Sequence, residues 1–129
     1  MLIPISAFYA SLLAMLFFYL TVLVIINRRG KKIPLGDGGD SHFQQYIRAH
    51  GNFTEYVPLV LLMLIIAEIN GSSSLALHIA GVCLLLGRGL HALGLIRHFG
   101  ASWQRVSGML FTFSALLILA LLNLYLLYW

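Results

Sequence analysis

Four apolar stretches dominate this chain and restrict its fold more than any other feature does. They cover residues 4–26, 56–69, 75–96 and 109–129. A membrane-spanning helix needs about 20 predominantly apolar residues, and three of the stretches reach that length. The second is shorter, but it becomes long enough if its helix begins near Ser41. The sequence therefore predicts an all-α membrane protein with four transmembrane helices.

The composition excludes the main classes of soluble protein. The 129 residues are 60% hydrophobic and 9% charged, whereas a soluble domain is roughly 45–50% apolar and about 25% charged. A soluble enzyme and a separate extramembrane domain are thereby excluded. The single cysteine, Cys83, excludes an intramolecular disulfide. The net charge of +4 has no water-facing domain to lie on, so we expect no nucleic-acid partner.

The positions of the basic residues predict how the helices cross the membrane. Arg28, Arg29, Lys31 and Lys32 follow the first apolar stretch, whereas residues 70–74, after the second, contain no basic residue. Lysine and arginine concentrate in cytoplasmic loops. We therefore expect loops one and three in the cytoplasm and both termini outside. Short loops and a small size favour a bacterial inner membrane.

We expect one domain, residues 1–129, folded as an antiparallel four-helix bundle. Its helices are predicted at about residues 4–27, 41–69, 75–97 and 104–128. Loop one would run from Asn27 to about Asp40, where Asp40 or Ser41 is a suitable helix N-cap. Small residues on helices three and four would allow close helix approach; they are Gly81, Gly87, Gly94, Ser107 and Gly108.

Other polar residues are predicted to mark helix ends or surfaces. Glu68 resembles the solvated end of helix two, and Tyr9 is a candidate for the aromatic belt at the membrane interface. His50 points away from the other polar residues of its helix and is predicted to be interfacial or to contact another subunit. No histidine, cysteine or carboxylate spacing resembles a metal site, so we expect no metal.

A polar stripe on helix two is the first candidate site. Arg48, Asn52 and Glu55 are spaced by four and three residues, which places them within an arc of about 60°. Farther along, the same face continues as Leu59 and Leu62. Because the stripe stops partway across the bilayer, it predicts a cavity that is open to the cytoplasmic side.

Helices three and four add further polar residues at a similar depth. Arg88 and His91 share a face of helix three, and Arg105 begins helix four on the same side of the membrane. Ionisable groups inside a span need a partner or a water-filled cavity. With the helix-two stripe they form a net positive set, which suits an anionic polar ligand.

Structural explanations compete with this one. Arg48 could be an interfacial residue whose charge reaches the headgroups. Glu55 and Arg88 could form a purely structural buried ion pair, and His91 alone would more often be a packed histidine than a catalytic one.

The segment from Arg48 to Pro58 resembles the MAPEG family, the membrane-associated proteins of eicosanoid and glutathione metabolism. Its pattern is Arg-x-x-x-Asn-x-x-Glu-Tyr-x-Pro at the start of the second of four helices. Arg88 and Arg105 also stand where the family has arginines, and the resemblance covers essentially the whole chain. It implies a homotrimer that binds glutathione between neighbouring subunits, near the cytoplasmic face.

The resemblance also implies roles for individual residues. Arg105 matches the arginine that stabilises the glutathione thiolate, which makes it the candidate catalytic residue. The implied glutathione-binding residues are Arg48, Asn52, Glu55, Tyr56, Arg88 and His91.

Three functions are compatible with this sequence. The first is a glutathione-dependent transferase or peroxidase that acts on lipophilic electrophiles reaching the site from the bilayer. The second is a non-catalytic lipid-binding or scaffold protein of the same fold, favoured by Leu95 at a position where several catalytic members have a glutathione-contacting tyrosine. The third is a small proton-coupled exporter. An exporter's carboxylate is expected near the midplane and unpaired, whereas Glu55 lies close to the cytoplasmic edge among arginines.

Overall fold

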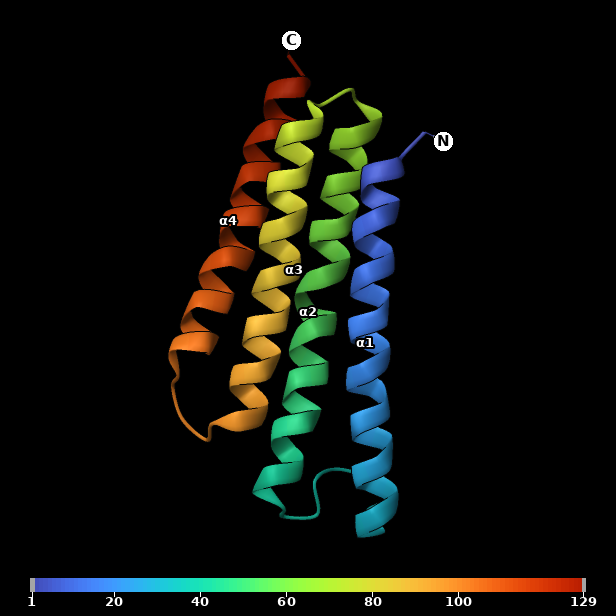
Figure 1. Ribbon diagram of the computed structural model, residues 1–129, viewed down its shortest axis with the longest axis vertical. Helices are drawn as coiled ribbons and strands as arrows, with labels where there is room; N and C mark the ends of the chain where they lie inside the picture. Colours follow the sequence, from blue (N-terminus) through green and yellow to red (C-terminus); the bar gives the residue numbers. More distant parts are fainter. Residues whose placement is uncertain (1, 129) are drawn as a thin grey trace.

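The computed structural model describes residues 2–128 and folds them into four antiparallel helices (Figure 1). The helices are α1 (Pro4–Lys31), α2 (Ser41–Ile69), α3 (Ser74–Arg97) and α4 (Trp103–Leu126). All four are long and apolar enough to cross a membrane. The predicted four-span bundle is therefore confirmed in its helix content.

Side chains from the preceding loops begin three of the helices. Asp40 accepts a hydrogen bond from the Phe43 amide, Ser73 from the Ala76 amide and Ser102 from the Arg105 amide. Such N-caps satisfy amides that have no partner within the helix. Asp40, one of the two N-caps predicted for helix two, is the residue that fills this role.

The first helix has no side-chain cap of its own, and α2 supplies one. The carboxylate of Glu68 accepts hydrogen bonds from the Ile5 amide at 2.8 Å and the Ser6 amide at 2.7 Å. A carboxylate at a helix N-terminus also complements the helix dipole. The prediction that Glu68 is a solvated helix end is therefore wrong, because its charge is used to join α2 to α1.

The first helix also extends past its apolar stretch, to Lys31 rather than to residue 27 as predicted. Arg28, Arg29 and Lys31 occupy its last turn, where cations interact favourably with the helix dipole. Hydropathy marks where a helix leaves the bilayer and not where it ends, which explains the error.

The helices pack through small residues at the predicted positions. A Cβ atom added to Gly108 would lie 2.6 Å from the backbone nitrogen of His91, and one added to Gly87 would lie 2.9 Å from the Gly108 carbonyl oxygen. Gly94 is similarly tight against Arg105. The close approach of α3 and α4 therefore depends on glycine, as the sequence predicts.

The packing corrects the prediction for Tyr9 and shows which residues His50 contacts within the chain. Tyr9 is buried in the core against Gly81, with its hydroxyl 3.0 Å from Nδ1 of His78, so it is not an interface residue. His50 lies 3.2 Å from the Thr21 hydroxyl and stacks on Phe17. It contacts α1 of its own chain, because α1 covers the side of α2 away from the polar stripe.

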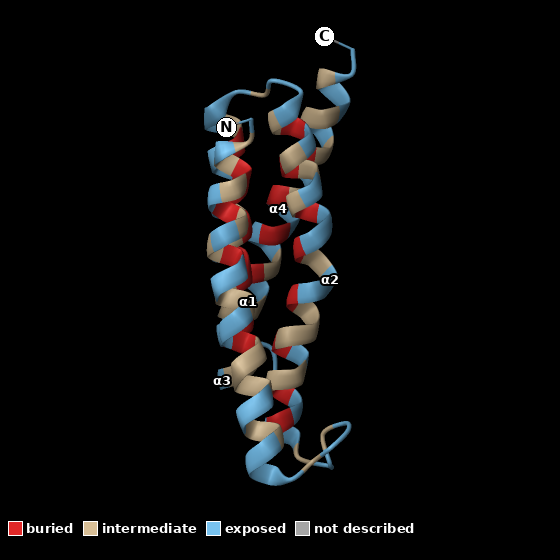
Figure 2. Cartoon of the chain, turned by 90° about the vertical axis from the view of Figure 1, so that its right-hand side faces the viewer, coloured by how far each residue is buried: buried red, intermediate tan, exposed pale blue. Residues whose placement is uncertain are grey.

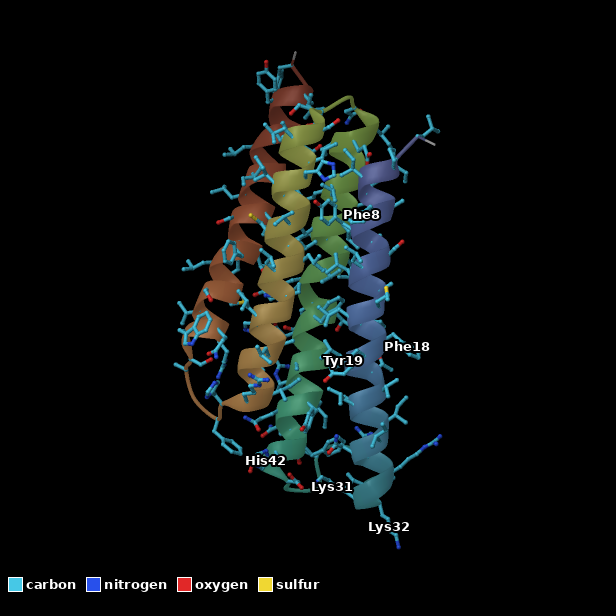
Figure 3. The ribbon with its side chains drawn as sticks, in the orientation of Figure 1. Phe8, Phe18, Tyr19, Lys31, Lys32 and His42 are labelled. Carbon is cyan, nitrogen blue, oxygen red and sulfur yellow. The ribbon has the colours of Figure 1, made fainter. Side chains whose placement is uncertain are left out.

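The outer surface of the bundle is apolar. Buried residues follow the inner faces of the helices, whereas the outer faces are exposed (Figure 2). Exposed large apolar side chains occur on every helix, among them Phe18, Leu62, Leu86 and Leu117, and Phe18 projects away from the bundle in Figure 3. Such a surface suits contact with lipid chains.

The two ends of the bundle differ in charge. Loop one (residues 32–40) and loop three (residues 98–102) lie at one end, opposite the chain termini and loop two (residues 70–73) (Figure 1). All eight lysines and arginines lie in the half of the bundle that is nearer to the first of these ends. We call it the basic end, and the other the terminal end.

Candidate functional site

The polar stripe of α2 forms a connected group near the basic end. Arg48 Nη1 lies 3.5 Å from Glu55 Oε1, and Asn52 Nδ2 donates to Glu55 Oε2 at 3.3 Å. The side chains of Arg48 and Glu55 are 54% and 50% exposed. The ion pair therefore lies on the outside of the single chain rather than in its core.

Arg88 of α3 joins this stripe from the interior. It is only 2% exposed, and its Nη1 donates to Asn52 Oδ1 at 2.6 Å while its Nε donates to the Thr112 hydroxyl at 3.0 Å. The guanidinium carbon lies 5.2 Å from the centre of the Tyr56 ring, within range of a cation–π interaction. The Asn52 amide thus links Arg88 to Glu55, and the two charges share a partner instead of forming a direct pair.

The depth of this group is intermediate. Glu55 is followed on α2 by residues 56–69, a rise of about 21 Å. If the far end of α2 marks the edge of a hydrocarbon core about 30 Å thick, Glu55 lies roughly 9 Å inside the opposite edge. A half-exposed ion pair at this depth is costly if it faces lipid.

Arg105 lies between two hollows at the basic end. Its Nη1 donates to the Gly100 carbonyl at 2.7 Å, which fixes the side chain against loop three. A hollow of about 430 Å³ on one side is mainly apolar. Its lining residues are His91, Ala101, Arg105, Val106, Met109, Leu110 and Phe113.

The second hollow, of about 180 Å³, is more polar. It is lined by Ser41, Gln44, Gln45, Arg48, Leu95, His98, Phe99 and Arg105. Gln45 is only 8% exposed, and neither atom of its amide group has a hydrogen-bond partner among residues 2–128. Buried polar groups are seldom left unpaired, so this amide is an exception within the wall of the hollow.

Comparison with known proteins decides the family. The model of the MAPEG family matches residues 6–125, which is almost the entire chain. The chain belongs to the MAPEG family.

Its relatives include a bacterial inner membrane protein. The inner membrane protein YecN of Escherichia coli K12 is 39% identical over 125 residues, which cover 97% of this chain and 94% of YecN. YecN of Escherichia coli O6:H1 strain CFT073 matches to the same extent. This chain is thus similar over nearly its full length to an inner membrane protein.

The MAPEG pattern predicted from the sequence falls largely in one place. Arg48, Asn52, Glu55, Tyr56 and Arg88 are joined by the contacts described above. The other two predicted residues, His91 and Arg105, are not hydrogen-bonded to this group within residues 2–128. Arg105 shares one hollow with Arg48 and another with His91.

Sequence reasoning missed three residues of the candidate site. Thr112 accepts a hydrogen bond from Arg88, the sulfur of Met109 lies 3.3 Å from Arg88 Nη2, and Gln45 lines the polar hollow. Thr112 follows Gly108 by one helical turn and so lies on the face of α4 that approaches α3. That spacing was the available signal for Thr112.

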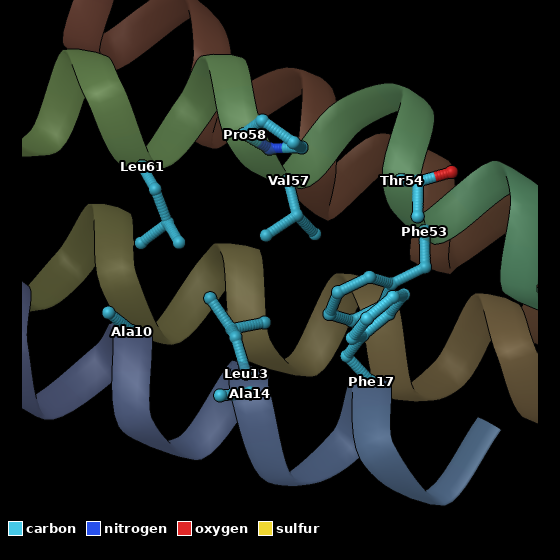
Figure 4. A pocket seen from close by; sticks show the side chains of 9 residues that line it. All are labelled: Ala10, Leu13, Ala14, Phe17, Phe53, Thr54, Val57, Pro58 and Leu61. Carbon is cyan, nitrogen blue, oxygen red and sulfur yellow. The ribbon is translucent and has the colours of Figure 1, made fainter. Parts of the chain in front are cut away.

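A further hollow of about 210 Å³ lies between α1 and α2 (Figure 4). Its walls are almost entirely apolar, formed by Ala10, Leu13, Ala14, Phe17, Phe53, Thr54, Val57, Pro58 and Leu61. It contains none of the predicted site residues, and its lining offers apolar contact and no charge.

Proposed function

We propose that this protein binds glutathione and uses it in a transferase or peroxidase reaction on lipophilic electrophiles. The position of Arg105 carries the proposal, because this residue lines both the polar and the mainly apolar hollow. A hydrophilic thiol peptide in the first and a lipophilic molecule in the second would meet at the Arg105 guanidinium.

The donor set fits the groups of glutathione, which has two carboxylates, an ammonium and a thiol. Guanidinium groups bind carboxylates bidentately, and both Arg48 and Arg105 line the polar hollow. Glu55, which is half exposed, is suited to the ammonium. Asn52 can bind the peptide groups while Arg88 positions it.

Tyr56 and His91 complete the proposed binding set. Tyr56 contacts the Arg88 guanidinium, and His91 lines the mainly apolar hollow with Arg105. We assign Tyr56 to positioning Arg88 and His91 to the wall nearest the bound thiol.

Arg105 has the chemical role in this proposal. An unperturbed thiol has a pKa of about 8.5, and a nearby guanidinium lowers it. Arg105 would therefore raise the fraction of thiolate at neutral pH. In a transferase reaction the sulfur forms a bond to an electrophilic carbon, the leaving group departs with the electron pair, and the thiol proton passes to water.

The test compares two arginine variants of the detergent-purified protein. Arg105→Ala is expected to lose at least 90% of its conjugation of 1-chloro-2,4-dinitrobenzene while calorimetry still detects glutathione binding. Arg97→Ala is the matched control, because Arg97 is exposed near the same end and lines neither hollow. Its activity should remain near that of the unmodified protein.

Two results would contradict the proposal. Full conjugation by Arg105→Ala would exclude thiolate stabilisation by this residue. Failure of the unmodified protein to bind glutathione in calorimetry would exclude the substrate itself.

We also propose that the protein is a homotrimer with glutathione bound between subunits. The support is the half-exposed Arg48–Glu55 pair inside the predicted span, which a neighbouring chain could shield from lipid. Light scattering of the detergent-purified protein should give a protein mass three times that of one chain. A single-chain mass would refute this assembly.

The basic end is proposed to face the cytoplasm, with both termini outside. The support is the position of all eight lysines and arginines in the half of the bundle that is nearer to that end. Cysteines introduced in loop one should react with a membrane-impermeant reagent only after the cells are opened. Labelling in intact cells would reverse the orientation.

A non-catalytic lipid-binding or scaffold role is the second candidate, and one observation favours it. Leu95 lines the polar hollow with an aliphatic side chain, which cannot donate a hydrogen bond to a thiolate. Glutathione binding without turnover of any model electrophile or hydroperoxide would select this role.

A further inference from the structure

Four basic residues lie at the end of α1, three in its last turn and Lys32 at its C-cap, and two of the four hold loop one in place. Arg28 Nη1 donates to the carbonyls of Ile33 at 3.1 Å and Gly36 at 3.2 Å, and its guanidinium lies 5.1 Å from the centre of the Phe43 ring. Lys31 forms an ion pair with Asp40. Both cations are therefore committed to contacts within the chain.

The other two cations, Arg29 and Lys32, remain available. Both are exposed, and neither makes a side-chain hydrogen bond or ion pair within residues 2–128. Lys31 lies beside loop one in Figure 3, whereas Lys32 extends from the end of α1 away from the bundle. Arg29 and Lys32 line a hollow of about 380 Å³ with Arg28, Ile33 and Pro34.

The backbone of Lys32 is in a conformation that side chains disfavour. Its φ of 55° and ψ of 36° are left-handed, and it is the one non-glycine residue with positive φ among residues 2–128. Glycine is the usual residue at such a helix C-terminus, because a side chain is disfavoured there. Lys32 therefore holds a backbone conformation that glycine would adopt at a lower cost.

This hollow lies at the level of lipid headgroups. The apolar part of α1, residues 4–26, rises about 34 Å and fills a hydrocarbon core of about 30 Å. The basic turn therefore emerges at the membrane surface. Ile25 and Ile26 are exposed just before it, and Leu35 beside it is 88% exposed, so apolar surface adjoins the cations on the membrane side.

We propose that Arg29 and Lys32 bind the phosphate of an acidic phospholipid of the phosphatidylglycerol class, in the leaflet next to loop one. Arg29 can hold two phosphate oxygens and Lys32 supplies a compact positive charge. The acyl chains would lie against Ile25 and Ile26. This binding site is separate from the hollows that Arg105 lines and does not depend on the proposed glutathione chemistry.

The experiment measures binding of short-chain phosphatidylglycerol to the detergent-purified protein by native mass spectrometry. Arg29→Gln and Lys32→Gln should each weaken binding about fivefold, the effect expected of one basic residue near an anionic surface. Lys31→Gln is the matched control. It removes the same charge one residue away, but from a side chain already paired with Asp40, so we expect less than a twofold change.

A second variant separates binding from folding. Lys32→Gly should raise the thermal midpoint, because it relieves the left-handed backbone, while it weakens phosphatidylglycerol binding as Lys32→Gln does. Unchanged affinity in Lys32→Gly would overturn the proposal.

The remaining arms test specificity. Phosphatidylcholine should bind at least fivefold more weakly than phosphatidylglycerol, and inorganic phosphate at the lipid's concentration should not displace it. Equal losses for Lys31→Gln and Lys32→Gln would show diffuse electrostatic attraction. Displacement by inorganic phosphate would show a site for a free anion. Either result overturns the proposal.

Discussion

Two glutamates of the same helix are used in opposite ways at the two ends of the bundle. At the terminal end, both carboxylate oxygens of Glu68 accept short hydrogen bonds from backbone amides of α1. Near the basic end, Glu55 meets Arg48 at 3.5 Å and Asn52 at 3.3 Å and remains half exposed. The carboxylate of Glu68 is fully paired within the fold, whereas the half-exposed carboxylate of Glu55 can still bind a ligand.

The neighbouring polar residues follow the same division. Near Glu68, the hydroxyl of the buried Tyr9 lies 3.0 Å from Nδ1 of the exposed His78, so these polar groups are paired with each other. Near Glu55, arginines line two hollows. A polar residue within a membrane span thus indicates a binding site only where its hydrogen-bonding groups are not all paired within the chain.

The largest expected effect tests the close packing of α3 against α4 at Gly108. Gly108→Val should destabilise the protein by about 3 kcal/mol or more, because the added atoms meet the backbone of α3 and cannot be relieved by side-chain rotation. Thermal unfolding in detergent measures the loss. Gly89→Ala is the control, since nothing lies within 4 Å of its added Cβ, and it should be neutral or slightly stabilising. Equal losses would show that helix approach does not depend on Gly108.

The next effect tests the terminal end directly. Glu68→Gln should cost about 1 kcal/mol of stability, the usual effect of losing a charged helix cap. Glutathione affinity should be unchanged, because Glu68 lies at the opposite end from both Arg105 hollows. A stable variant with weakened glutathione binding would erase the distinction between the two carboxylates.

Local periodicity explains which of these features the sequence could predict. The stripe of Arg48, Asn52 and Glu55 needs only helical spacing, and the α3–α4 glycines need only the preference for small residues at close crossings. By contrast, the bonds of Glu68 to Ile5 and Ser6 join residues more than 60 positions apart. Their pairing depends on the rotation and offset of α1 against α2, which no local pattern specifies.

The same reason explains the unpredicted partners within the site. The sequence places Arg88 and Glu55 at similar depths, but the rotation of each helix decides that Asn52 comes between them. Thr112 and Gln45 are polar residues that one helical face alone does not distinguish from ordinary packing residues.

A smaller stability effect is expected for the basic-end carboxylate. Glu55→Gln should change stability by less than about 0.5 kcal/mol, as is usual for a half-exposed ion pair. Its glutathione affinity should fall at least tenfold, because the ammonium loses its counter-charge. Calorimetry and thermal unfolding of both variants test this difference. Glu68→Gln should lose stability but keep its glutathione affinity, whereas Glu55→Gln should lose affinity but keep most of its stability. Unchanged affinity in Glu55→Gln would remove this residue from the proposed site.

The smallest effect concerns a third carboxylate, Asp40, which is partly exposed and forms an ion pair with Lys31. Hydrogen bonds from Lys31 and from the Phe43 amide lower the pKa of Asp40 below its ordinary value of 3.8. A lowered folded-state pKa contributes stability that is present above the unfolded-state pKa and lost as the pH falls through the folded-state value. Asp40→Asn keeps a residue that can cap a helix, so near pH 7 it should lose only the charge interaction.

The thermal midpoint, followed from pH 7 to pH 3, measures this contribution. The advantage of the unmodified protein over Asp40→Asn should begin to shrink as the pH falls below about 4, the ordinary range of an aspartate pKa, and should be lost as the pH passes the lower folded-state pKa of Asp40. Lys31→Gln should reduce that advantage, and the double variant should show less than the sum of the two single losses. An advantage that does not shrink between pH 7 and pH 3 would show that the shape of Asp40, and not its charge, stabilises loop one.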